Sequence, residues 1–195
     1  MRFLLRASRV LALLTNGVGK LAAWCLFPLM LVIVGDVVMR RYFAIGSIRL
    51  QEFEWHLHTV LFMLCLGYAY LCDAHVRIEL VREGLGERAR LFIEATGIVF
   101  LLLPLCWVMV DYSADLVSRS YAAGERSPHP SGLPRRWLIK AVMPVGYALL
   151  SLSALSILAR SVVILFGTPE QRQAARLLVA PNKFEDEAAT QGARP

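Results

Sequence analysis

The sequence has 195 residues, of which 57% are hydrophobic and only 18% are charged. Soluble domains are typically about 45–50% apolar and about 25% charged, and a soluble fold of this length has too little interior to enclose such a surplus. The apolar residues also gather into four blocks that are nearly free of charge. These features exclude a soluble globule, a disordered chain and a disulfide-rich secreted domain, and they indicate a small polytopic membrane protein.

Four apolar segments are long enough to cross a bilayer, because a transmembrane helix needs about 20 mostly apolar residues. They are residues 21–39, 55–72, 95–110 with some flanking residues, and 141–159. Proline occurs inside three of them, which helices in lipid tolerate better than helices in water. The sequence therefore predicts an all-α integral membrane protein with four transmembrane helices.

Two further segments are expected to form amphipathic interfacial helices. Near the N-terminus, Arg2, Arg6 and Arg9 fall on one helical face and leave an apolar face for the inner leaflet. Residues 72–88 can lie along the inner interface in the same way, with a solvated turn as an equal alternative. Residues 1–167 are thus predicted to form the membrane domain, and residues 168–195 a polar, disordered tail.

Thirteen of the 21 lysine and arginine residues lie in the N-terminal segment, the second loop and the C-terminal segment, and eight lie in the other two loops. Because positive charge is enriched on the cytoplasmic side of membrane proteins, both termini are expected in the cytoplasm. The net charge of +6 is spread over all of these segments. This distribution favours contact with membrane lipids and argues against nucleic-acid binding.

Titratable residues do not converge on a common cavity in the predicted topology. A haem held between helices needs one histidine from each of two helices at similar depth, whereas His56 and His58 share one helix at a spacing of two. The four cysteines form no CxxC pair, so neither a disulfide framework nor a zinc site is indicated. We therefore predict no catalytic residue, no cofactor and no metal site, and hence no enzyme.

Polar residues inside the predicted spans have structural interpretations. Asp36 can pair with Arg40 at a spacing of four on a helix. Arg160 is expected to anchor the last span at the interface, with its guanidinium reaching lipid phosphates. The small residues Gly146, Ala148, Ser151, Ser153 and Ser156 are expected to form one face for close helix packing.

The boundary between the first two spans carries opposite charges. Arg40 and Arg41 end the first span, and Glu52 and Glu54 open the second. Acidic residues at that position are also expected simply because the positive end of a helix dipole favours negative charge. The alternative is that these charges order the hairpin or meet a partner.

Several segments in order carry a family resemblance: MRRYF, QEFEWHLHTVLF, DAHVRIEL and GERSPHPSGLPRRWLIKAVMPVGYALL. Over about residues 21–167 the chain resembles the DctQ family, the small membrane subunit of TRAP transporters. The resemblance implies a multi-pass protein of the bacterial inner membrane. Its implied partners are a large multi-span permease subunit and a periplasmic substrate-binding protein.

The resemblance also implies a function, namely to scaffold the large subunit of a sodium-coupled organic acid importer and to help dock the binding protein. Candidate residues for hairpin ordering or partner contact are Arg40, Arg41, Glu52, Glu54, His75, Arg77 and Glu79. The transported compound would be selected by the other chains. Two alternatives remain open, a membrane-anchor subunit of a respiratory or redox complex and a stand-alone four-helix channel or exporter.

Overall fold

The computed structural model describes residues 1–74 and 86–177. Within these residues the chain is helical and contains no strand, which confirms the predicted fold class at the level of an all-α protein. The elements are α1 (Arg2–Ala23), α2 (Leu26–Phe43), α3 (Ile48–Leu71), α5 (Glu87–Gly97), the π-helical turn η1 (Ile98–Leu102), α6 (Leu103–Ala122), α7 (Trp137–Phe166) and α8 (Pro169–Leu177).

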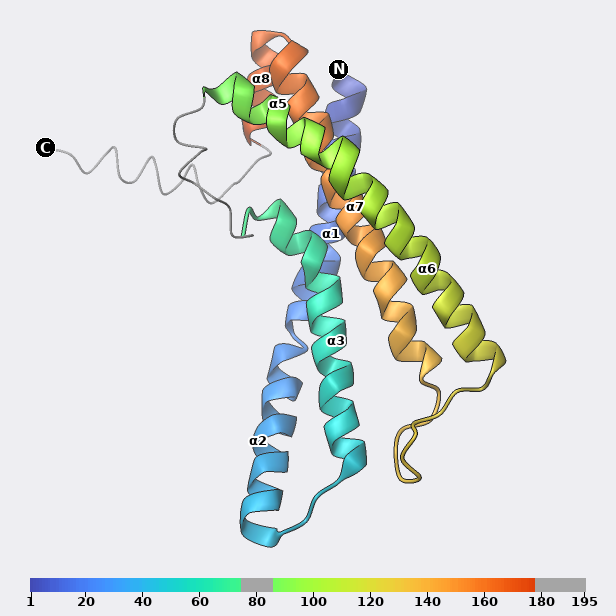
Figure 1. Cartoon of the computed structure of the whole chain (residues 1–195). Helices are drawn as coiled ribbons and strands as arrows, with labels where there is room; N and C mark the ends of the chain where they lie inside the picture. Colours follow the sequence, from blue (N-terminus) through green and yellow to red (C-terminus); the bar gives the residue numbers. More distant parts are fainter. Residues whose placement is uncertain (75–85, 178–195) are drawn as a thin grey trace, which may run out of the picture.

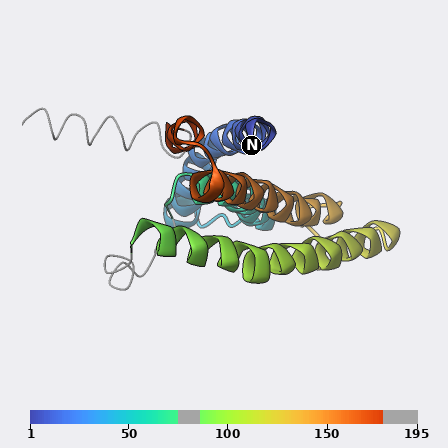
Figure 2. The same cartoon turned by 90° about the horizontal axis from the view of Figure 1, so that it is seen from above.

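Helix α7 is the centre of the molecule. It packs against α1, α3 and α6 over long stretches, and α2 packs mainly on α3. Figure 2 shows α7 between α1 on one side and the α5–α6 helix on the other. Helices α1, α3 and α7 thus pack against one another, and α2 on α3 and α6 on α7 lie at the edges of this group.

The first predicted span, residues 21–39, does not form one helix. Helix α1 ends at Ala23 and α2 begins at Leu26, and between them Trp24 and Cys25 form a turn with right-handed backbone angles in which hydrogen bonds span three residues. Pro28 explains this break, because a proline has no N–H to donate and its ring crowds the carbonyl group four residues earlier, which belongs to Trp24. The amphipathic N-terminal segment is helical as expected, but it packs against α3 and α7 with Ser8, Thr15, Gly19 and Ala22 buried.

Close contact between helices depends on glycine. A Cβ on Gly146 of α7 would lie 2.7 Å from the carbonyl oxygen of Met63 on α3. A Cβ on Gly67 of α3 would lie 2.8 Å from the carbonyl oxygen of Leu149 on α7. These glycines let the backbones of α3 and α7 approach, as small residues do in membrane helices. Ser153 and Ser156 are buried with Gly146, which confirms most of the expected packing face, but Ala148 is exposed and does not belong to it.

Three helical segments are long and apolar enough to span a membrane, by length and composition: Arg2–Phe43, Glu87–Ala122 and Trp137–Phe166. Helix α3, which contains the predicted span 55–72, is not among them although it has 24 residues. Its first turns carry Arg49, Glu52 and Glu54, and two histidines follow. The count of four spans therefore stays a prediction.

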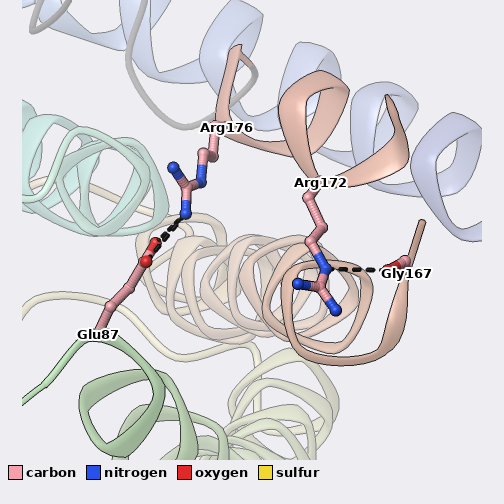
Figure 3. A network of polar contacts seen from close by, with 4 residues as sticks. All are labelled: Glu87, Gly167, Arg172 and Arg176. Carbon is pink, nitrogen blue, oxygen red and sulfur yellow. Dashed lines mark hydrogen bonds and ion pairs between the residues drawn. The ribbon is translucent and has the colours of Figure 1, made fainter. Parts of the chain in front are cut away.

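The structure describes the first residues of the predicted tail, 168–195. Helix α8 begins at Pro169, shortly after Gly167, and packs against α7. Arg172 donates a hydrogen bond from Nε to the carbonyl oxygen of Gly167, at 2.9 Å, and so caps the end of α7 (Figure 3). Residues 178–195 lie outside the described part of the chain.

Candidate functional site

The end of the bundle that carries the turn 44–47 and the loop 123–136 is called the loop end here. Figure 1 shows the α2–α3 pair and the α6–α7 pair spreading apart toward this end, with the loop extending past the ends of α6 and α7. The turn itself follows from local chemistry. Ala44 adopts a left-handed conformation that ends α2, and the hydroxyl of Ser47 accepts a hydrogen bond from the Leu50 N–H at the start of α3. Glu52 therefore sits in the second turn of α3.

Glu52 binds the loop between α6 and α7. Its Oε2 accepts a hydrogen bond of 2.6 Å from the backbone N–H of Leu133, and its Oε1 accepts one from the hydroxyl of Ser127. Only 5% of its surface is exposed. A buried carboxylate with two donors is a strong anchor, because hydrogen bonds to a charged acceptor are stronger than neutral ones. Glu52 thus joins the α2–α3 pair to the α6–α7 pair.

The loop is shaped to receive this carboxylate. Ser127 donates its backbone N–H to Leu133, and Gly132 donates its N–H to His129, so the loop folds back on itself. A Cβ on Gly132 would lie 2.2 Å from the Ser127 hydroxyl and 2.8 Å from Glu52 Oε2. Only glycine fits beside the carboxylate. Arg49 on α3 adds a second link, a 2.8 Å hydrogen bond from Nε to the carbonyl oxygen of Ser131.

A second glutamate fastens the base of the same loop. Glu125 accepts hydrogen bonds from the Ser120 hydroxyl, at 2.6 Å, and from the Lys140 ammonium group. Its backbone carbonyl accepts the Arg136 N–H. Beside this base, Tyr121 and Trp137 form an edge-to-face ring pair with centroids 5.3 Å apart, a geometry that aromatic pairs prefer. The loop is therefore tied at both its base and its tip.

Hydrogen bonding lowers the pKa of both glutamates below the usual value of 4.5. For Glu52 the main cause is the Leu133 N–H, followed by the Ser127 hydroxyl. For Glu125 the main cause is the hydrogen bond from Lys140, followed by Ser120. Both carboxyl groups are therefore held in the charged form, which is the form that accepts these hydrogen bonds.

The other residues predicted at this boundary have different surroundings. Arg40 pairs with Asp36 at 2.7 Å, which confirms the expected pair within one helix. Arg41 is exposed, and Glu54 is half-buried with its Oε1 enclosed and without a hydrogen-bond partner among the described residues. Within the described part of the chain, no ion pair joins Arg40 or Arg41 to either glutamate. Of the four residues predicted at this boundary, Glu52 is the one whose described hydrogen bonds reach the loop between α6 and α7.

Three of the predicted site residues, His75, Arg77 and Glu79, lie outside the described residues, as does most of the amphipathic segment 72–88. The end of the bundle opposite the loop end carries the N-terminus, the start of α5 and α8 (Figure 1). It is called the terminal end. There Arg176 of α8 contacts both carboxylate oxygens of Glu87 on α5, at 2.7 and 2.9 Å (Figure 3). This exposed ion pair ties α8 to α5.

The sequence did not predict a buried polar cluster at the terminal end. Arg160 donates hydrogen bonds of 3.0 Å to the hydroxyls of Ser8 on α1 and Ser156 on α7, and Ser156 also donates to the carbonyl oxygen of Ser8. Both serines are fully buried and Arg160 is 5% exposed. The expectation that Arg160 reaches lipid phosphates is therefore wrong. Its side chain faces the joint between α1 and α7, where the hydroxyls satisfy its N–H groups.

In the residues that the structure describes, no group of three or more histidine, cysteine or acidic side chains is placed to hold a metal ion. His56 uses Nδ1 for a hydrogen bond with the carbonyl oxygen of Glu52, one turn back on α3. The observed arrangement can hold helices and a loop in fixed positions, and its chemistry is that of ion pairing and hydrogen bonding.

Comparison with known families identifies the chain. Residues 29–163, from α2 to near the end of α7, match the family model described as the DctQ component of tripartite ATP-independent periplasmic transporters. The chain belongs to the DctQ family. A search of curated proteins gave no match. DctQ proteins are the small permease components of TRAP transporters and work with a large permease subunit and a periplasmic binding protein.

The match to the DctQ family confirms the expected resemblance. Together with the helices long enough to span a membrane, it indicates a multi-pass subunit of the inner membrane. A DctQ protein is a component of a transporter, which is not a class of enzyme. The matched region contains Glu52, Ser127 and Leu133, so the loop anchor lies inside the family's domain. Ser8 lies outside the match, and Arg160 lies near its end.

Proposed function

We propose that this DctQ subunit is a scaffold that transports nothing by itself. It would hold the large subunit of a sodium-coupled organic acid importer and offer its loop end to the binding protein. Both termini would lie in the cytoplasm, and all four predicted segments, including α3, would cross the membrane. His75, Arg77 and Glu79 would contribute to the inner corner of the scaffold.

The observation that carries this proposal is the uncovered apolar surface of the two edge helices, α2 and α6. Helix α2 buries only Leu29 and Asp36 and leaves most of its apolar surface uncovered. The exposed large residues of α2 include Phe27, Met30, Leu31, Val34 and Val37, and those of α6 include Leu105, Trp107, Val108, Met109 and Tyr112. Such faces can be covered by lipid or by the apolar helices of a larger subunit. A stand-alone channel or exporter would need helices arranged around an enclosed path through the subunit.

The buried polar groups also support a scaffold. Transporters bind substrate and ions at polar sites near the bilayer midplane, on broken helices. Here the buried charged residues Asp36, Glu52 and Arg160 each have partners within this chain, at a helix turn, a loop or a helix joint. A redox anchor that holds haem would require one histidine from each of two facing helices, whereas His56 and His58 both lie on α3.

Co-expression with the large permease subunit of the same TRAP system tests the proposal. Affinity purification through a tag on this chain should bring down the large subunit in a stoichiometric complex that survives in mild detergent. A tag on Arg2, placed in the cytoplasm, should be protected from protease added to intact spheroplasts. Homo-oligomers without the large subunit, or bound haem in the purified protein, would contradict the scaffold function.

A further inference from the structure

Helix α1 has three different faces. The first, buried against α3 and α7, consists of small residues: Ser8, Thr15, Gly19 and Ala22. The second, called the arginine face, consists of exposed basic residues: Arg2, Arg6 and Arg9. The third consists of exposed apolar residues: Phe3, Val10, Leu14 and Leu21. At 3.6 residues per turn, the three series follow sides of the helix about a third of a turn apart. Among the described residues, only the first face is covered by the chain.

The arginine face has no counter-charge on its own helix. Helix α1 contains no aspartate or glutamate, and the three arginines form no ion pair or hydrogen bond with any residue that the structure describes. The exposed acids described at the terminal end are Glu87 on α5 and Glu170 on α8. Glu87 is already bound by Arg176. Exposed positive charge therefore exceeds exposed negative charge in the described part of this end.

The contact of α1 with α7 sets the depth of the arginine face in the membrane. Trp137 belongs to an aromatic pair at the start of α7, and such rings prefer the headgroup level of a bilayer. From Trp137 to Ser156 the helix rises by about 28 Å, which is close to the hydrocarbon thickness of about 30 Å. The hydroxyls of Ser156 and Ser8 are 3.0 Å apart. Arg6 and Arg9 flank Ser8 along the chain, so they lie at the headgroup level on the other side of the membrane.

The chemistry of this surface fits a phospholipid with a net negative charge. A guanidinium group can bind two oxygens of one phosphate, and basic residues near the membrane surface are attracted to anionic lipids. The exposed apolar face beside the arginines, with Phe3 79% exposed, suits acyl chains. A soluble polyanion would leave that face uncovered. Arg160, at the same depth, is not available to lipid because its N–H groups bind Ser8 and Ser156.

We propose that Arg2, Arg6 and Arg9 form a binding site for an anionic phospholipid. Its headgroup phosphate would lie on the arginine face, and an acyl chain would follow Phe3 and Val10. The bound lipid would hold the outer side of α1, whose inner side is held by α3 and α7. The site needs only the depth of α1, so it depends neither on the scaffold function nor on which side of the membrane the terminal end faces.

Native mass spectrometry of the full chain in detergent tests the site, with separate titrations of phosphatidylglycerol and phosphatidylcholine. One arginine near an anionic lipid surface strengthens binding about fivefold, so three should favour phosphatidylglycerol by at least about tenfold. The test variant combines Arg2→Gln, Arg6→Gln and Arg9→Gln. We expect its preference for phosphatidylglycerol to fall to about twofold or less, while its affinity for phosphatidylcholine stays unchanged.

The matched control combines Arg41→Gln, Arg126→Gln and Arg135→Gln, which removes the same charge from exposed arginines of the loop end. These arginines lie at the other end of the 30-residue helix α7, so screening separates them from the arginine face. The control should keep the preference of the unchanged chain. An equal loss of preference in the control would replace the local site by the overall charge of the protein and would overturn the proposal.

The remaining outcomes are also decisive. An unchanged chain that binds both lipids equally would overturn the site. Displacement of phosphatidylglycerol by excess inorganic phosphate would assign the arginine face to a free anion, and not to lipid. The glutamine variant should keep the Tm of the unchanged chain without added lipid. If its Tm is lower, the corresponding triple lysine variant decides, because it keeps the charge: a normal Tm without the preference would overturn the proposal, and a normal Tm with the preference would support it.

Discussion

Glu52 joins the two helix pairs at the loop end, with Arg49 as a second link. Both of its partners, the Leu133 N–H and the Ser127 hydroxyl, donate to it. In Glu52→Gln one of the two acceptor oxygens becomes an NH₂ group, which is a donor. It either faces the Leu133 N–H, which also donates, or requires the Ser127 hydroxyl to turn and accept a hydrogen bond. We expect hydrogen exchange in a peptide covering residues 127–134 to become at least about tenfold faster, because a hydrogen bond to a charged group is lost.

Glu54→Gln is the control for this substitution, since it has the same chemistry two residues away and no contact with the loop among the described hydrogen bonds. Exchange in the same peptide should match that of the unchanged protein. Equal acceleration by both substitutions would mean that the negative charge at the start of α3 acts only through the helix dipole.

The same anchor should depend on pH in a defined direction. The pKa of Glu52 in the folded protein lies below the usual value of 4.5, so the charged carboxylate stabilises the loop at every pH above that value. This stabilisation is lost as the pH falls below 4.5 and through the folded-state pKa. Protection of the Leu133 amide, corrected for intrinsic exchange, should therefore be constant near neutrality and fall in this acidic range.

Glu125 has a lowered pKa as well, so the base of the loop should loosen in the same range. The Glu52→Gln variant separates the two groups, because any remaining acid-dependent loss of protection in it belongs to Glu125. A loss of protection that begins near pH 6–7 would contradict the assignment to carboxyl groups.

At the scale of elements, the contact of α3 with α7 depends on Gly146. An alanine there would place its Cβ 2.7 Å from the Met63 carbonyl oxygen, and backbone cannot move away as a flexible side chain can. Overpacking of this kind costs about 1–3 kcal/mol, so we expect Gly146→Ala to lower the Tm of the purified subunit in detergent.

Gly35→Ala in α2 is the matched control, because a Cβ at Gly35 meets no atom within 4 Å. Alanine has the higher helix propensity, by about 1 kcal/mol in soluble helices, so this change should leave the Tm equal or raise it. A lower Tm for Gly35→Ala than for Gly146→Ala would contradict the helix arrangement described for α2, α3 and α7.

The joint between α1 and α7 gives a second prediction for the elements. Ser8→Ala removes the acceptor of Arg160 Nε and one partner of Ser156. Interhelical hydrogen bonds in membrane proteins contribute about 0.6 kcal/mol on average and at most about 1.7 kcal/mol, and the Ser8 hydroxyl takes part in three of them. We expect a stability loss of about 1–2 kcal/mol in reversible unfolding by detergent. Ser118→Ala, at an exposed serine of α6, should lose almost none.

Sequence patterns predicted the helices well where apolar composition alone determines them, as in α6 and α7. They did not indicate the turn at Trp24 and Cys25 between α1 and α2, although the first predicted span lies inside the apolar segment Arg2–Phe43. They also missed the loop anchor, because Glu52 lies 75 residues from Ser127 and 81 from Leu133. A pattern along the chain carries no direct information on contacts at such separation. Arg160 was misplaced for the same reason, since its partner Ser8 is 152 residues away.

At the scale of the whole molecule, the apolar residues and the charged residues have different roles. The apolar residues form the packed group of α1, α3 and α7 and the uncovered faces of the edge helices α2 and α6. The buried charged residues Glu52, Asp36 and Arg160 each have partners within the chain. This division agrees with the scaffold function proposed for this DctQ subunit.

Uptake by reconstituted proteoliposomes tests this account most directly. Vesicles would contain this chain alone, or this chain with its large subunit, under an inward sodium gradient. The transported compound would be radiolabelled and supplied bound to the periplasmic binding protein of the same TRAP system. The account predicts uptake only in vesicles that hold both subunits, and none above empty vesicles for this chain alone. Uptake by this chain alone, at a rate comparable with that of the pair, would contradict it.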